Sequence, residues 1–150
     1  MVSIFAVIFV LFLTGCNSPA PDHLGVRQNL FAPCPQYRWN CVSSFAHNKK
    51  QWIRPFPYAG KPVEDFKRDL KMAILGMGGK VILEKDDYLH AEFTTTWLGL
   101  LSFVDDVEVY FPRDKEEAYL KSKARVGIYD FGANRTRLEK IRFDLYQSGT

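Results

Sequence analysis

Two segments with alternating apolar and polar residues, 101–111 and 118–129, stand only six residues apart in this chain. Such alternation is typical of β-strands that cover a core with one face. A connection this short predicts an antiparallel hairpin, because parallel strands need a crossover of a dozen residues or more. Asp105 is the one charge on the predicted inward face, and a lone buried carboxylate is costly unless it is bonded. That inward face comprises Phe103, Asp105, Val107, Val109, Phe111, Leu120, Ser122, Ala124, Val126 and Ile128.

Charges on the other face of this hairpin predict its register. A turn centred on Asp114-Lys115 places Asp106 opposite Lys123 and Glu108 opposite Lys121. Opposite charges in facing positions stabilise an antiparallel pair, each exposed pair by about 0.2 to 1 kcal/mol. We expect this second face to be polar and its ion pairs to be exposed.

The remaining segments predict an α+β fold. Residues 80–85 and 88–95 are strand-like, and the apolar stretch 51–56 next to two prolines suits an edge strand. The order strand, helix, four strands, helix predicts an antiparallel sheet of about five strands with two helices packed on one face. The first helix opens at Pro62 with the stripe Val63, Phe66, Leu70, Ile74 and Met77. The second is capped by Asn134 and buries Leu138, Ile141 and Leu145.

An apolar run, residues 2–13, ends in Leu13-Thr14-Gly15-Cys16. This pattern is typical of a bacterial lipoprotein signal whose cysteine receives diacylglycerol before cleavage. The alternative is a transmembrane anchor, but the run has twelve residues, whereas about 20 are needed to span a bilayer. We therefore expect Cys16 to attach the protein to membrane lipid in the bacterial cell envelope, facing the periplasm or the cell exterior.

These patterns divide the chain into three parts. Residues 1–15 are the expected signal peptide, 16–33 the lipidated cysteine and a flexible tether, and 34–150 a single α+β domain. The tether is expected because its stretch is polar, contains prolines and glycine, and lacks a period. The formal charge of +3 comes without a dense basic block, which argues against nucleic acid as a partner.

Cys34 and Cys41, the two cysteines of the expected domain, form an even pair in an oxidising compartment. We predict a local disulfide between them. A redox-active dithiol is the alternative, but the six-residue spacer differs from the Cys-X-X-Cys of exchange enzymes. His23, His47 and His90 lack the paired spacing of metal ligands, so we expect neither a metal nor a cofactor.

Several motifs of the chain match one family. They are Cys34-Pro35, Asn40-Cys41-Val42-Ser43-Ser44, Phe103-Val104-Asp105-Asp106-Val107-Glu108, and Ser122-Lys123-Ala124-Arg125-Val126-Gly127 followed by Asp130, Gly132, Asn134, Arg135, Arg137 and Glu139. By these residues the chain resembles the family of domain of unknown function 1499, over nearly the whole expected domain. The resemblance implies no established activity.

The signature suggests a ligand-binding site. Arg125, Arg135 and Arg137, with Asp130, Asn134 and the amides that open the last helix, could hold a phosphate or carboxylate. In the alternative these residues are structural. The arginines then pair with acidic residues, Asp130 tightens a turn and Asn134 caps the helix. Alternation places Arg125 on the opposite face from Asp105, which argues against that particular pair.

The expected function is that of a lipid-anchored, non-catalytic binding or scaffold module for a partner protein or an anionic small ligand. A small envelope hydrolase is the alternative, because Ser43, Ser44, His47 and His90 supply the atoms of a nucleophile and its base. No nucleophile-elbow sequence surrounds either serine. We therefore expect no catalytic residues.

Overall fold

The computed structural model describes residues 19–98 and 101–147 of the chain. The predicted signal peptide, residues 1–15, and the predicted lipid attachment site at Cys16 lie outside the described residues. Within the described ranges, no helix is both long enough and apolar enough to span a membrane.

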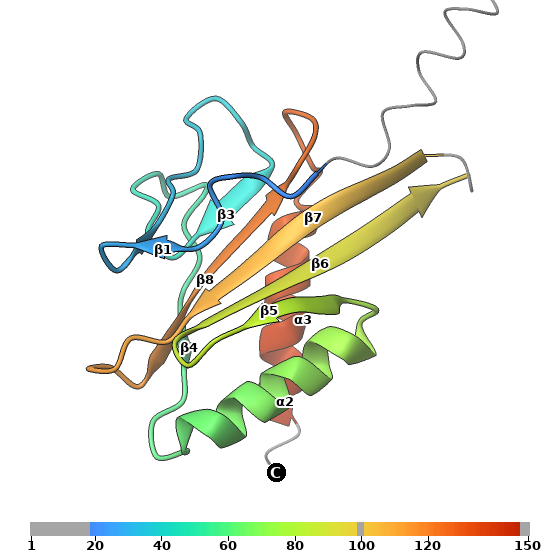
Figure 1. The fold of residues 1–150 in the computed structure, drawn as a ribbon. Helices are drawn as coiled ribbons and strands as arrows, with labels where there is room; N and C mark the ends of the chain where they lie inside the picture. The colour runs from blue at the N-terminus through green and yellow to red at the C-terminus, as the bar shows by residue number, and fades with distance from the viewer. Residues whose placement is uncertain (1–18, 99–100, 148–150) are drawn as a thin grey trace, which may run out of the picture.

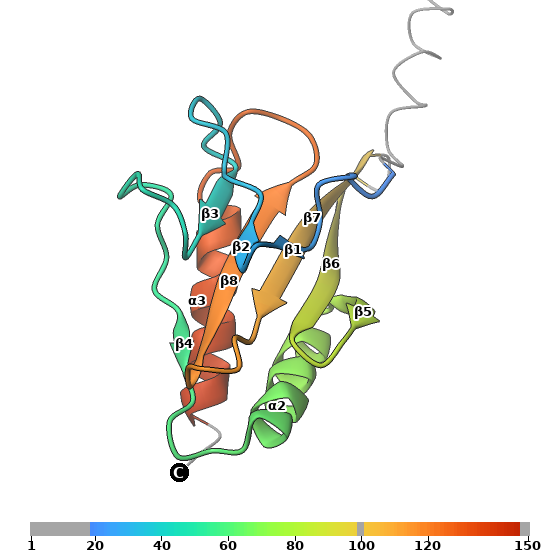
Figure 2. The ribbon, with the colours of Figure 1, turned by 60° about the vertical axis from the view of Figure 1, so that its left-hand side comes forward.

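An antiparallel sheet and two helices make up the fold (Figure 1). The main sheet has the order β3-β8-β7-β6-β5, and β4 also pairs with β8. Both helices lie on one face of this sheet, while β1 and β2 lie on the other (Figure 2). The predicted α+β fold is therefore confirmed. The elements are β1 (Val26–Arg27), β2 (Leu30–Phe31), β3 (Cys41–Ser43), β4 (Phe56–Pro57), α2 (Val63–Gly76), β5 (Lys80–Glu84), β6 (Tyr88–Trp97), β7 (Leu101–Tyr110), β8 (Glu117–Ala124) and α3 (Ala133–Gln147).

The central hairpin has the predicted register. Asp106 pairs with Lys123, and Glu108 pairs with Lys121, across β7 and β8. Phe103, predicted to face inward, is instead 41% exposed, because β7 extends there beyond the last residue of β8. The apolar side chains that this hairpin contributes to the core beneath the helices are Val107, Val109, Phe111, Ala118 and Leu120.

Strand β8 ends earlier than predicted. Its last residue is Ala124, so Val126 and Ile128 are not inward but 37% and 65% exposed. The cause is Asn40, whose side-chain amide donates hydrogen bonds to the carbonyl oxygens of Val126 and Gly127 at 3.2 and 2.8 Å. These bonds take the place of those that a longer strand would make, and the chain turns away from β7.

The two helices follow the predicted stripes. Helix α2 buries Phe66, Leu70 and Ile74 and carries Glu64 and Asp65 in its first turn, where acidic side chains complement the dipole. Pro62 occupies the position before the first helical residue. Helix α3 buries Leu138, Ile141 and Leu145. Both apolar stripes face the same core.

The turn after α2 requires a glycine at position 79. A Cβ atom there would lie 2.6 Å from Phe93 Cζ and 2.8 Å from Ile74 Cγ2. Both are core side chains, so we expect Gly79→Ala to lower the free energy of unfolding by about 1 to 3 kcal/mol. Gly76→Ala is the matched control, because nothing lies within 4 Å of its added Cβ. Urea unfolding measures both variants, and equal stabilities would contradict the close contact.

The N-terminal segment differs from the predicted tether. Val26 pairs with Phe31 in a hairpin whose two turn residues, Gln28 and Asn29, have φ values of 52° and 63°. Positive φ at both positions is typical of the tight turn that matches strand twist. Phe31 is buried together with Tyr88 and other aromatic side chains on the second face of the main sheet. Residues 26–31 are therefore folded onto the sheet and are not a tether.

Candidate functional site

The second face of the main sheet is a buried layer of charges. We call it the covered face, because the N-terminal hairpin lies over it (Figure 1). The predicted exposure of its ion pairs is wrong, since Asp106, Glu108 and Lys121 are at most 4% exposed. The covered face comprises Tyr88, His90, Glu92, Asp106, Glu108, Lys121 and Lys123 from the strands, and Arg125, which follows β8 and pairs with Glu92 and Asp106.

Glu108 is the most fully satisfied of these charges. Its carboxylate accepts hydrogen bonds from Lys121 Nζ at 3.0 Å, from the Tyr88 hydroxyl at 2.8 Å and from the backbone N–H of Gly25 at 2.7 Å. Burial and the neighbouring Glu108 charge raise the pKa of the Tyr88 hydroxyl, which stays protonated as a donor. The N-terminal segment therefore contributes a direct bond to this carboxylate.

Arg125 joins the other carboxylates of the covered face. It donates to Asp106 Oδ2 from Nε at 2.9 Å and to Asp106 Oδ1 from Nη2 at 2.7 Å, and it also binds Glu92. His90 Nε2 lies 2.8 Å from Asp106 Oδ1. Ligand-type atoms of His90, Glu92 and Asp106 lie within 4.8 Å of one another, a spacing that could hold a metal ion. The guanidinium, however, already supplies the positive charge that these carboxylates need.

The Asp106 carboxyl gives the fold a defined acid sensitivity. Burial by itself raises the pKa of this group, but hydrogen bonds from His90 and Arg125 outweigh burial and bring the pKa below its ordinary value of 3.8. A depressed folded-state pKa stabilises the protein above the unfolded value, and this stability is lost as pH falls through the folded value. We expect the free energy of unfolding to fall below pH 3.8, and Asp106→Asn to show a shallower fall. Urea unfolding over an acid pH series measures this, and parallel curves for the two proteins would contradict it.

Arg137 lies on the helix face of the sheet and is likewise paired. It binds Asp105 and donates to Asn134 Oδ1 at 2.8 Å. The inward carboxylate predicted from alternation thus has its partner, and alternation correctly excluded Arg125 as that partner. Arg125 and Arg137 therefore lie on opposite faces of the sheet.

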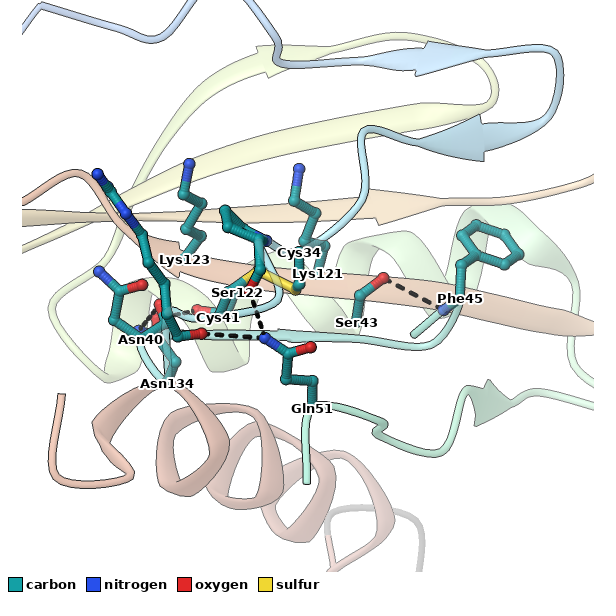
Figure 3. Close-up of a disulfide and its surroundings, with 12 residues drawn as sticks. Cys34, Asn40, Cys41, Ser43, Phe45, Gln51, Lys121, Ser122, Lys123 and Asn134 are labelled. Atoms are coloured by element: carbon teal, nitrogen blue, oxygen red, sulfur yellow. Dashed lines mark hydrogen bonds between the residues drawn. A yellow bond between two sulfur atoms is a disulfide. The ribbon is translucent and has the colours of Figure 1, made fainter. Parts of the chain in front are cut away.

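Asp130, not Asn134, caps the last helix. The Asp130 carboxylate accepts hydrogen bonds from the backbone N–H groups of Gly132 and Asn134, both at 2.9 Å. Asn134 lies inside the first turn and is fully buried, and its side chain binds Ser122 and the Asn40 carbonyl (Figure 3). The prediction for Asn134 is wrong because Asp130, three residues before the first helical residue Ala133, accepts the hydrogen bonds of the free amides instead. These amides are thus already occupied by a carboxylate.

Arg135 has a different environment from the other signature arginines. Its guanidinium donates to the carbonyl oxygens of Lys50 and Trp52, at 3.0 and 2.8 Å. Neither Arg135 nor Lys50 forms a salt bridge within residues 19–98 and 101–147. The Lys50 ammonium lies over the Trp39 ring, 5.3 Å from its centroid. Among the described residues, these two cations therefore have no carboxylate partner.

A pocket of about 420 Å³ opens beside these two cations. We call it the loop pocket, since the loops before β3, after β3 and before α3 form its walls. Its lining residues are Trp39, Cys41, Val42, Lys50, Gln51, Tyr129, Asp130, Gly132 and Arg135. Of the five predicted ligand residues, only Asp130 and Arg135 line it.

The predicted disulfide between Cys34 and Cys41 supports one wall of the loop pocket (Figure 3). Their Cα atoms lie 5.7 Å apart. Gln51 spans the closed loop by donating to the carbonyl oxygens of Pro35 and Arg38, both at 2.9 Å. A loop this short contributes about 2 to 3 kcal/mol in the chain-entropy account of disulfides. The covalent closure and Gln51 thus hold the loop in place.

The atoms for a hydrolase are present but not assembled. The hydroxyl of Ser43 accepts the backbone N–H of Phe45 at 3.2 Å, and that of Ser44 accepts the backbone N–H of Leu120 at 3.0 Å. His90 is bound to Asp106 on the covered face. Among the residues with described positions, no hydrogen bond joins either serine to a histidine. Both hydroxyls therefore serve the backbone around β3.

Sequence reasoning missed the pocket residues outside the signature. Trp39 and Lys50 stand in loops without a period, and their proximity depends on Asn40 and Gln51, which bind distant carbonyls. Trp39, Lys50 and Tyr129 come together only in the fold, so no local sequence signal was available for them.

Comparison with known proteins gives a family match. A family model described as "Protein of unknown function (DUF1499)" matches residues 31–145. The matched range begins in β2 and ends in α3, so it includes the whole main sheet. No curated protein matches the sequence.

Proposed function

The chain belongs to the DUF1499 family of proteins of unknown function, and since membership supplies no activity, we propose a function from the site. The protein is a lipid-anchored, non-catalytic protein of the bacterial envelope that binds an anionic small ligand in the loop pocket. Cys16 attaches it to membrane lipid, as the sequence Leu13-Thr14-Gly15-Cys16 suggests. The ligand carries a phosphate or carboxylate group.

The observation that supports this proposal is that the arginines near the C-terminus differ in their partners. Arg125, Arg137 and Arg142 each form a salt bridge with a carboxylate. Arg135 donates only to carbonyl oxygens among the described residues, and it lines a pocket together with the exposed Lys50. Cations that face a cavity without a carboxylate partner favour an anion there.

The walls of the loop pocket also suit a small molecule. Its volume of about 420 Å³ lies within the range of known ligand pockets. Trp39 and Tyr129 supply apolar surface beside the cations, as is typical of sites where a few polar groups orient a ligand. The carboxylate of Asp130 lines the same pocket but is engaged by the amides of α3.

A binding titration tests the proposal. Because Trp39 lines the pocket, its fluorescence is the readout, and Trp39→Phe assigns the signal against Trp52 and Trp97. The full-length chain, extracted in detergent, is titrated with glycerol phosphate, and in a second arm it is placed in nanodiscs containing phosphatidylglycerol. The first arm detects a free anion and the second a lipid headgroup.

We expect saturable binding in one of these arms and at least a roughly tenfold weaker affinity in Lys50→Ala, which corresponds to about 1.4 kcal/mol. Lys49→Ala, an exposed neighbour that does not line the pocket, is the matched control. Binding that is absent in both arms, or equally strong in Lys50→Ala, would refute the site.

A further inference from the structure

Exposed apolar side chains gather at one end of the molecule. This end, which we call the loop end, consists of the adjoining ends of β6 and β7 with Leu98, the loop between β8 and α3, and the loop before β3. Both ribbon views place these three segments at the same end of the sheet (Figures 1 and 2). Their exposed apolar residues are Tyr37 at 83%, Leu98 at 72%, Ile128 at 65%, Tyr129 at 59% and Phe131 at 91%.

Two of these exposed residues have an unfavourable backbone conformation. Leu98 has a φ of 52° and Phe131 a φ of 54°. The left-handed region is rare for bulky side chains, and strain of this kind persists where the surrounding structure enforces it. For Phe131 the neighbouring Asp130 carboxylate, which accepts the Gly132 N–H, enforces the turn. Strained and exposed apolar tips indicate a surface that contacts something else.

The course of the N-terminal segment shows what lies there. Gly25 binds Glu108, and His23 lies beside Lys123, 3.1 Å from its ammonium. Lys123 is one residue from the end of β8, so the chain, followed backwards, runs along the sheet toward the loop end. The views agree, since the first described segment starts at that end (Figures 1 and 2).

This course fixes the distance to the membrane if Cys16 is lipidated. Only two residues, Asn17 and Ser18, separate Cys16 from Pro19, the first described residue, and the three steps along the chain span at most about 10 Å. Because the N-terminal hairpin is packed on the covered face, little tether remains between lipid and domain. The loop end must then lie close to the lipid headgroups.

We infer that the loop end is a membrane-docking surface, with Leu98, Ile128 and Phe131 placed in the lipid interface beside the Cys16 anchor. This inference rests on the lipid anchor of the proposed function. Tyr37 and Tyr129 suit the headgroup level, where aromatic side chains with a polar tip are enriched. The exposed Arg38, in the loop before β3, complements anionic lipids.

Site-directed labelling of the full lipoprotein tests this orientation. Single variants Leu98→Cys and Phe131→Cys carry an environment-sensitive fluorophore, because Cys34 and Cys41 are paired in the disulfide. Met72→Cys on α2 and Asp114→Cys in the β7–β8 turn are the matched controls, exposed and away from the loop end. The proteins are reconstituted in vesicles of phosphatidylethanolamine and phosphatidylglycerol that contain a quencher on the acyl chains.

Labels at positions 98 and 131 are expected to shift to the blue and to be quenched several-fold more strongly than those at 72 and 114. Equal, water-like emission from all four positions in vesicle-bound protein overturns the orientation alone. A blue shift without lipid quenching also overturns it and indicates a protein partner. If the protein does not float with the vesicles in a density gradient, the lipid anchor itself is refuted. The inferred membrane-docking surface is then refuted as well.

Discussion

Lys121→Ala is expected to lower the free energy of unfolding by about 3 to 5 kcal/mol, because it leaves a buried carboxylate without its cation. The Lys121 and Glu108 side chains are each 2% exposed, and their N···O distance is 3.0 Å. Tyr88 and Gly25 still donate to Glu108 in the variant, but neither carries a charge. Urea unfolding followed by circular dichroism measures the loss.

A double variant distinguishes the contribution of the Lys121–Glu108 ion pair from that of side-chain packing. Lys121→Met with Glu108→Gln removes both charges at similar volume, and we expect it to lose less than Lys121→Ala alone. Lys140→Ala, an exposed position on α3, is the surface control. A cost for Lys121→Ala within about 0.5 kcal/mol, typical of surface substitutions, would mean that the covered face is open to water.

Arg125→Ala is expected to lower the free energy of unfolding by a similar amount, about 3 to 5 kcal/mol. The substitution leaves the Asp106 and Glu92 carboxylates without the cation that pairs with both. The loss should shrink in acid, where the Asp106 carboxylate is protonated. Arg125→Lys keeps the charge but not the bidentate hydrogen bonding to Asp106, so an intermediate loss of stability is expected.

The same variant tests which residues bind the ligand. Arg125 lies on the covered face and does not line the loop pocket. Folded Arg125→Ala protein should therefore bind the anionic probe with unchanged affinity. If folded Arg125→Ala protein bound the probe more weakly while its free energy of unfolding was unchanged, Arg125 would have to be a ligand-binding residue.

Alternation and facing charges were sufficient to predict the hairpin of β7 and β8, because both are local properties of two adjacent segments. They could not predict that Lys121 is buried. That burial depends on Phe31, which is distant in sequence and whose ring lies under the Lys121 ammonium, and on the turn at Gln28-Asn29 that brings Phe31 there. The sequence pattern of a polar strand face is the same whether water or another segment of the chain covers that face.

The site was predictable only in part for a related reason. The signature arginines stood out in sequence, but their partners come from other elements, and partners decide whether an arginine is structural or available. Arg137 meets Asp105 from β7, whereas Arg135 meets only carbonyl oxygens of the loop after β3 among the described residues. Asp130 caps the helix in place of Asn134, whose side chain instead binds Ser122 and the Asn40 carbonyl from other elements.

Native mass spectrometry of the full chain, extracted from its own membranes without denaturation, tests the central claim most directly. We predict a chain that begins at Cys16, carries a covalent diacylglycerol, and retains an anionic adduct that is lost in Lys50→Ala but kept in Lys49→Ala. An unmodified chain that still begins at Met1 and carries no adduct would contradict both the anchor and the binding site.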